Sequence, residues 1–121
     1  MVHSSKTENR NIGRIGERLA EEFLVGKGLE LVLRNSSTRF GEIDLIMTDK
    51  GILVFVEVKT KKGLGFGSPE EMFTQGKLRK VRNMATVYLK GQEVACRIDM
   101  VAVVLDDDNN PVSIKHYENV T

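Results

Sequence analysis

The chain has 121 residues, a formal net charge of +1, 40% hydrophobic and 29% charged residues, which is typical of one globular domain with an apolar core. No run approaches the ~20 apolar residues of a membrane span, and the polar N-terminus is unlike a signal peptide. Cys96 is the only cysteine, which excludes an intrachain disulfide and a cysteine-based zinc cluster and favours a reducing, cytoplasmic setting.

The first part of the chain is predicted to hold a tail, a helix and a strand. Residues 1–11 are polar and are expected to form a disordered tail, which leaves residues 12–121 as a single domain. Apolar residues recur at helical spacing from Ile12 to Leu24, and the glycines just beyond are typical of a helix end. Residues 29–34, LELVLR, alternate like a strand, and the NSSTRFG that follows is predicted as a loop.

Further strands and a second helix follow. EIDLIM (residues 42–47) and ILVFVEVK (52–59) are predicted strands joined by a turn. After a glycine-rich loop, SPEE predicts the start of the second helix, with Ser68 as N-cap, proline in the first helical position and a capping-box glutamate. VACRIDMVAVVL (94–105) is predicted as a buried central strand, and VSIKHYE (112–118) as an optional edge strand.

These elements predict an α/β fold with one mixed β-sheet. The first three strands have short links and should form an antiparallel meander. The second helix is a crossover, so the strand after it should lie parallel to the strand before it. The expected order is therefore helix, three strands, helix and strand, with two helices packed against the sheet.

Charged residues interrupt the two most hydrophobic strands. Glu57 and Lys59 share one face of their strand, since residues two apart point the same way. A two-residue turn within TDKG, or a four-residue turn, would place Asp44 opposite Glu57 with Cβ atoms ~5 Å apart. A three-residue turn would put them on opposite faces unless a bulge restored the phase. The apolar pattern favours the first register, with Ile43 and Leu45 together on the core face.

Two anionic carboxylates at that distance repel, so something has to compensate for their charge. A salt bridge from Lys59 is one explanation, and it implies no further function. A divalent cation is the other, because hard carboxylate oxygens suit Mg²⁺ or Mn²⁺. The residues by themselves leave both explanations open.

A basic segment follows these strands. Residues 59–90 hold eight Lys or Arg and two Glu, so eight minus two leaves a local charge of +6. Such a segment can present a basic surface to phosphates, or it can be a plain solvated helix face. The candidates for nucleic-acid contact in and near it are Arg39, Lys61, Lys62, Gln75, Lys77, Arg79 and Lys80.

Asp44 followed by Glu57-Val58-Lys59 resembles the D…(D/E)-x-K signature of restriction-endonuclease-like, or PD-(D/E)xK, nucleases. A wider set of motifs is similar to the YraN-like family, uncharacterised bacterial proteins that are themselves similar to archaeal Holliday-junction resolvases. The motifs, spread over about residues 12–105, are Gly13 to Glu17, Arg34-Asn35, Gly41 to Ile46, Phe55 to Lys59, Lys77 and Arg97 to Asp99.

The resemblance implies a restriction-endonuclease-like core and assigns roles to residues. Asp44, Glu57 and the backbone carbonyl of Val58 would bind Mg²⁺ or Mn²⁺, and Lys59 would orient or help deprotonate the attacking water. Glu17, on the first helix, is the fourth catalytic and metal-binding candidate, or else a solvent-facing glutamate. Glu42 and Arg34 are expected to contact the metal-binding residues without binding the metal themselves, unless Arg34 pairs with another carboxylate.

The function implied by the resemblance is a Mg²⁺- or Mn²⁺-dependent endonuclease acting on DNA, in particular branched or structured DNA. Two other functions remain open: a catalytically silent nucleic-acid-binding module of the same fold, and a structural or interaction protein. Similar resolvases act as dimers, which makes a homodimer one expected arrangement. Arg97 and Asp99 are interpreted as a structural ion pair, and His116 suggests no role.

Overall fold

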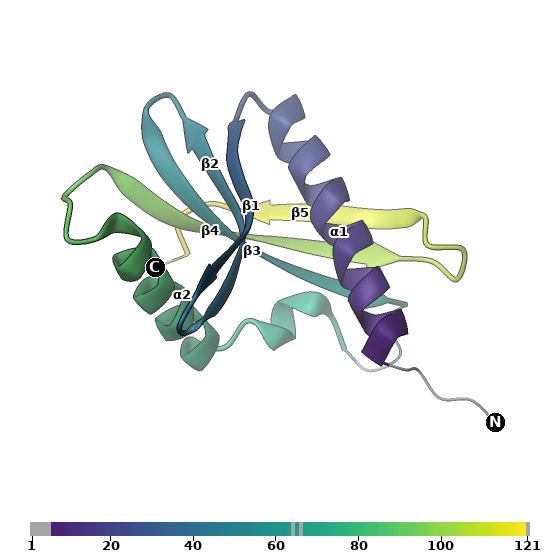
Figure 1. Ribbon diagram of the computed structural model, residues 1–121. Helices are drawn as coiled ribbons and strands as arrows, with labels where there is room; N and C mark the ends of the chain where they lie inside the picture. Colours follow the sequence, from purple (N-terminus) through teal and green to yellow (C-terminus); the bar gives the residue numbers. More distant parts are fainter. Residues whose placement is uncertain (1–5, 64, 66, 121) are drawn as a thin grey trace.

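The structure is a computed structural model that describes residues 6–63, 65 and 67–120, with side chains from residue 8 onward (Figure 1). It confirms the predicted α/β class, the order of elements and the last edge strand. The elements are α1 (Lys6–Gly26), β1 (Glu30–Thr38), β2 (Gly41–Asp49), β3 (Ile52–Lys62), the 3₁₀ helix η1 (Pro69–Met72), α2 (Gln75–Leu89), β4 (Cys96–Leu105) and β5 (Pro111–Tyr117). No helix in these described ranges is long and apolar enough to cross a membrane.

The five strands form one sheet in the order β1-β2-β3-β4-β5. All neighbours are antiparallel except β3 and β4, which are parallel as the crossover predicts. The β2–β3 turn has two residues, Lys50 and Gly51, with φ of 52° and 86°. Both values lie in the left-handed region that two-residue hairpin turns require.

A helix covers each face of the sheet, so β3 is buried on both sides (Figure 1). Val54, Val56 and Val58 pack in the cluster that includes Ala20 and Leu24 of α1. The alternate residue Phe55 packs in the cluster formed by Leu78, Val81, Met84 and Ala85 of α2. Because β3 is close-packed on both faces, its backbone is held rigidly. This rigidity fixes the positions of Glu57 and Lys59, which lie at the middle of the strand and just beyond it.

Gly16 lets α1 approach β3 closely. A Cβ atom at this position would lie 1.8 Å from Oγ1 of Thr60 and 2.8 Å from its Cβ, so a side chain here would force the helix or Thr60 to move. The glycine is therefore needed for the packing distance between helix and strand. Its neighbour Glu17 is brought to the edge of the sheet as a result.

The predicted tail and the predicted loop after the first strand are both shorter than expected. α1 begins at Lys6, so residues 6–11 are helical, and residues 1–5 lie outside the described part of the chain. Lysine, glutamate and arginine have good helix propensity and can extend a helix beyond its apolar stripe. β1 continues to Thr38, because pairing with β2 outweighs the polar composition of its second half.

The second helix begins later than its sequence signal predicts. Ser68 and Pro69 start only the single turn of η1, and the Ser68 side chain does not cap it. α2 begins at Gln75, where the Thr74 side chain accepts a hydrogen bond from the Lys77 amide at 3.2 Å. A second N-cap residue a few positions along therefore takes the role assigned to Ser68.

Candidate functional site

β2 and β3 separate at the position of the charged residues. Their pairing runs from Asp49–Ile52 to Leu45–Val56, whereas β2 stays paired with β1 down to Gly41. β3 continues along β4 as far as Lys62. The strands therefore form a fork, which we define as residues 41–44 of β2 facing residues 57–59 of β3.

Asp44 is the first residue of β2 beyond the last pair. One further step in the same register places it across from Glu57, as the two-residue turn predicts. Its Oδ2 accepts a hydrogen bond from the Val58 amide at 2.7 Å, so the carboxylate bridges the opening fork. The prediction that Ile43 and Leu45 share a face is wrong: Leu45 packs in the α1 cluster and Ile43 in the α2 cluster, so the alternation of side chains is interrupted where the β2–β3 pairing ends.

The surroundings of Asp44 favour its protonated form. Burial is the largest cause and the negative charge of Glu57 the second, and together they raise the pKa of Asp44 to about 8. The hydrogen bond from Val58 acts against this rise, and the charge of Glu17 adds to it. No Lys or Arg within the described ranges lies within ion-pair distance of Asp44.

Lys59 neutralises the other carboxylate. Its Nζ lies 3.2 Å from Oε2 of Glu57, and the two side chains are only 15% and 11% exposed. The salt bridge that the sequence offered as one explanation is therefore present. It compensates one carboxylate of two, which leaves the cation explanation open for Asp44.

Glu17 reaches the fork from α1. Its Oε1 accepts a hydrogen bond from Nδ2 of Asn35 at 2.9 Å. Burial raises the pKa of Glu17, the Asn35 hydrogen bond opposes this, and the charges of Glu42 and Glu57 add to the rise. The charge of Glu17 thus acts on both carboxylates of the fork, and its side chain is half-buried.

Asn35 is a site residue that the sequence did not reveal by itself. It appeared only as part of the Arg34-Asn35 motif. Its φ of 48° lies in the left-handed region, which asparagine tolerates better than most residues. This backbone turn gives the side chain its direction toward Glu17.

Lys77 reaches the fork from α2, on the other face of the sheet. The nearby charge of Lys59 is the main cause that lowers the pKa of Lys77, followed by burial. The charge of Glu57 acts in the opposite direction. Two ammonium groups from different elements therefore face the same glutamate.

Of the two supporting candidates, only Glu42 lies near these carboxylates. It is exposed, and its charge acts on Glu17. Arg34 instead pairs with Glu21, to which its Nε and Nη2 donate at 2.7 and 2.9 Å. This is the alternative that the sequence left open for Arg34.

The remaining candidates for phosphate contact differ in their surroundings. Arg39 lies over the ring of Phe40 at 5.1 Å in the β1–β2 turn. Lys80 of α2 lies against the same turn, since a Cβ at Gly41 would come 3.2 Å from its Cε. Lys61 donates to the Gly67 carbonyl at 3.2 Å. Lys62, Gln75 and Arg79 are exposed.

The donors at the fork suit a magnesium-like ion without forming a complete cage. Within the described ranges, no group of three or more His, Cys, Asp or Glu side chains is arranged to hold a metal. Mg²⁺ usually takes one or two carboxylates and completes its shell with water and phosphate oxygens. Asp44 and Glu57 fit that requirement, and the Val58 carbonyl remains a predicted third donor.

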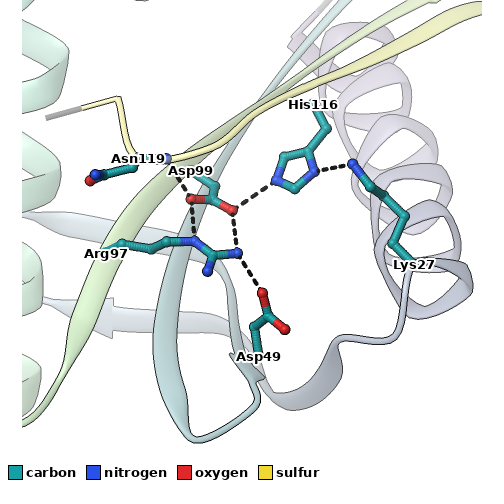
Figure 2. A network of polar contacts seen from close by, with 6 residues as sticks. All are labelled: Lys27, Asp49, Arg97, Asp99, His116 and Asn119. Carbon is teal, nitrogen blue, oxygen red and sulfur yellow. Dashed lines mark hydrogen bonds and ion pairs between the residues drawn. The ribbon is translucent and has the colours of Figure 1, made fainter.

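A second buried polar cluster lies beside the β2–β3 turn (Figure 2). Arg97 pairs with Asp99 at 2.9 Å and with Asp49 at 3.0 Å, which confirms the predicted ion pair. His116 lies 2.8 Å from Asp99 through Nε2 and 2.7 Å from Nζ of Lys27 through Nδ1. The sequence missed His116, because only the strand pairing brings it to Asp99.

Comparisons with known proteins place the chain in a family. The family model described as "Uncharacterised protein family UPF0102" matches residues 16–103. The chain is 44% identical over 98 residues to a UPF0102 protein of Symbiobacterium thermophilum, covering 78% of this chain and 83% of that protein. It is 42% identical over 117 residues to one of Corynebacterium efficiens, covering 95% of each.

A UPF0102 protein of Nocardia farcinica is 40% identical over 116 residues, covering 93% of this chain and 91% of that protein. The expected membership of an uncharacterised bacterial family is thus confirmed, and the nuclease superfamily stays a prediction. The chain belongs to the uncharacterised protein family UPF0102.

Proposed function

We propose that the protein is a metal-dependent nuclease that hydrolyses phosphodiester bonds in DNA at the β2–β3 fork. The observation that carries this proposal is the pairing of the half-buried Asp44 with the buried Glu57, with Lys59 at 3.2 Å from Glu57. Carboxylates, a lysine and a raised carboxyl pKa gathered in one place are a recognised mark of a catalytic site.

Asp44 and Glu57 would hold Mg²⁺ or Mn²⁺ in this proposal. The bound ion would supply Lewis acidity to the phosphodiester and to the attacking water. It would also remove the unfavourable charge interaction that raises the pKa of Asp44, because a cation favours the ionised carboxylate.

The other residues act on water and phosphate. Lys59 is held by Glu57 and can orient the attacking water and offset the negative charge that develops on phosphorus. Lys77 adds positive charge from the α2 side, where a phosphate oxygen would be partly desolvated. Glu17, held by Asn35, closes the fork on the α1 side and can bind a water in the ion's outer shell.

A cleavage assay tests the proposal. Purified protein is incubated with plasmid, four-way-junction and single-stranded DNA, with Mg²⁺, Mn²⁺ or EDTA. Asp44→Asn and Glu57→Gln should each lower the cleavage rate by more than the roughly 10–100-fold that losing an outer partner of a metal costs. Glu118→Gln, which changes an exposed carboxylate, serves as the matched control.

The three candidate functions give different results. Equal cleavage by wild type and Glu57→Gln, or none on any substrate, rules out the nuclease. DNA binding that persists in Asp44→Asn without cleavage indicates the silent binding module. Absence of DNA affinity even at low salt leaves the structural or interaction protein, since phosphate contacts are strongest there.

A further inference from the structure

Phe40 is a large apolar side chain at the tip of the β1–β2 turn. It lies there with Arg39, between the paired residues Thr38 and Gly41, and it is 37% exposed. Oγ1 of Thr38 accepts a hydrogen bond from the Phe40 amide at 3.0 Å and donates one to the Gly41 carbonyl at 2.9 Å. Neither core cluster of the described residues includes Phe40. The ring is therefore presented to the surface by a turn that its own hydrogen bonds hold in shape.

Positive charge lies next to this ring. The guanidinium of Arg39 is 5.1 Å from the ring centre. Helix α2 passes beside the turn (Figure 1), and a Cβ atom built on Gly41 would lie 3.4 Å from Nζ of Lys80. The helix carries three further Lys or Arg and no Asp or Glu. No ion pair within 4 Å involves Arg39 or any cation of α2 in the part of the chain that the structure describes.

The acidic side chains near the turn do not cancel this charge. Glu42 is the acidic residue closest to Phe40 in sequence, and its charge acts on Glu17 of α1, whereas Lys80 belongs to α2. Two cations, Arg39 and Lys80, against one carboxylate leave a charge of +1 around the tip. The remaining cations of α2 add to it.

An exposed aromatic ring beside unpaired cations suits a nucleobase and its phosphate. Bases stack on the faces of aromatic rings and of arginine guanidinium groups, and positive side chains attract the phosphates that flank the base. We propose that Arg39 and Phe40 form a stacking site for one unpaired base of a nucleic acid, and that Lys80 holds the adjoining phosphate.

The stacking site lies close to the proposed cut. The chain from Phe40 to Asp44 spans at most about 14 Å, since a residue adds no more than ~3.6 Å. One strand of DNA rises about 3.4 Å per nucleotide, so the stacked base is only a few nucleotides from the fork. This position rests on the proposed nuclease function, whereas the stacking contact can be measured without cleavage.

The stacking site selects a class of substrate. Within a duplex the neighbouring pairs cover both faces of a base, so a side chain at the surface can stack only on a base that is unpaired. Such bases occur in single strands, overhangs and branch points. The inferred substrate is therefore a nucleic acid with a single-stranded segment beside the cut.

The chain offers a matched control for Phe40. Phe23 in α1 is 36% exposed, and Nζ of Lys27 lies 5.4 Å from the centre of its ring. Its exposure and its contact with a cation thus nearly equal those of Phe40, but it lies outside the β1–β2 turn. Phe23→Ala therefore shows what the loss of an exposed aromatic ring does elsewhere on the surface.

Binding measured in EDTA tests the stacking contact. Fluorescence anisotropy compares three labelled hairpin duplexes: one with a thymidine overhang, one with an overhang of abasic nucleotides, and one with a blunt end. Phe40→Ala should weaken binding to the thymidine overhang about tenfold. It should bind the abasic overhang like wild type, because that probe keeps the phosphates but has no base to stack. Phe40→Tyr keeps the ring and should match wild type, whereas Phe40→Leu keeps only apolar bulk and should resemble Phe40→Ala.

The outcomes separate the stacking site from the nuclease. Stacking is wrong if Phe40→Ala loses as much affinity for the abasic or blunt probe, if it binds the thymidine overhang like Phe23→Ala, or if wild type binds no probe at low salt. If stacking is supported but wild type with Mg²⁺ or Mn²⁺ cleaves nothing, only the proposed nuclease fails. Cleavage by wild type, with binding by Phe40→Ala equal to that of Phe23→Ala, overturns the stacking site alone.

Discussion

Oδ2 of Asp44 accepts a hydrogen bond from the Val58 amide at 2.7 Å, at the point where β2 separates from β3. A side chain thus continues a contact that backbone groups make along the rest of the hairpin. The bond holds Asp44 across from Glu57 although the strands have separated. The same placement buries a carboxyl beside a second carboxylate, which is costly to the folded protein whenever both are ionised.

The first prediction concerns pH. The pKa of Asp44 is about 8 in the folded protein and ~3.9 in an unfolded chain, so between these values the folded state binds one proton more. Stability therefore falls as pH rises through that window. Asp44→Asn keeps an acceptor for Val58 and should remove the fall, and at pH 9 it should be more stable than wild type by at least ~1 kcal/mol.

Urea unfolding at pH 5, 7 and 9 in EDTA measures this difference. Asp107→Asn, in the exposed β4–β5 turn, should follow the wild-type profile. The explanation fails if Asp44→Asn differs from wild type by the same free energy at pH 5 and at pH 9.

The second prediction is that metal binding releases a proton. At pH 7 most Asp44 side chains are protonated, because their pKa is about 8, and an ion binds only the ionised carboxylate. Calorimetric titration of Mn²⁺ into the protein should give different heats in Tris and in PIPES, corresponding to nearly one proton per ion. Asp44→Asn should bind more weakly and release no proton. Equal heats for wild type in both buffers would contradict the site.

Local patterns in the sequence predicted most of the fold. Alternation and turn chemistry favoured the β2–β3 register that the structure shows, and with it the placement of Asp44 across from Glu57, although they put Ile43 on the wrong face. The crossover argument gave the parallel β3–β4 pair. Element ends were less predictable, as Ser68 and Thr74 show: both are good N-caps, and only packing decides which one starts the long helix.

The site was predictable where one hairpin carries it and unpredictable where distant elements meet. Asp44, Glu57 and Lys59 follow from two neighbouring strands. The contact of Asn35 with Glu17 depends on a left-handed residue in β1 and on the approach of α1 to the sheet. Neither the left-handed residue nor the approach of α1 gives a periodic pattern in the sequence. The contact between Asn35 and Glu17 could therefore not be predicted from sequence patterns.

The third prediction tests the close packing of α1 against β3 at Gly16. Gly16→Ala places a methyl group where Thr60 already lies, so α1 must shift, at a cost of about 1–3 kcal/mol for an overpacked contact. Gly13→Ala is the matched control, because nothing lies within 4 Å of its Cβ position. That control should gain up to ~1 kcal/mol from helix propensity. Chemical denaturation of both variants distinguishes close packing from a general effect of alanine.

The fourth prediction concerns Asn35. Asn35→Gly keeps the left-handed backbone and removes the donor to Glu17. Since that hydrogen bond lowers the pKa of Glu17, its loss should move the titration midpoint of Glu17 further up. Carboxyl ¹³C shifts followed by NMR measure the midpoint, with Glu118 as internal reference. An unchanged midpoint would mean that Asn35 does not hold Glu17 in solution.

The last prediction addresses the Asp99 cluster of Figure 2. Burial acts to raise the pKa of Asp99, but hydrogen bonds from Arg97, the Asn119 amide and His116 outweigh it and leave the pKa below its ordinary value. Asp99 therefore contributes stability above the pKa of an unfolded aspartate, and this stability is lost as pH falls through the lower folded pKa.

Asp99→Asn should cost about 1–3 kcal/mol at pH 7, because Arg97 would keep only Asp49 as a charged partner, and the cost should shrink as pH falls through the folded pKa of Asp99. Asp107→Asn is again the control.

The same geometry fixes the His116 tautomer: Lys27 can only donate, so Nδ1 accepts and Nε2 carries the proton that it donates to Asp99. Imidazole ¹⁵N shifts measure this directly, and a proton on Nδ1 would mean that Lys27 does not bind the ring.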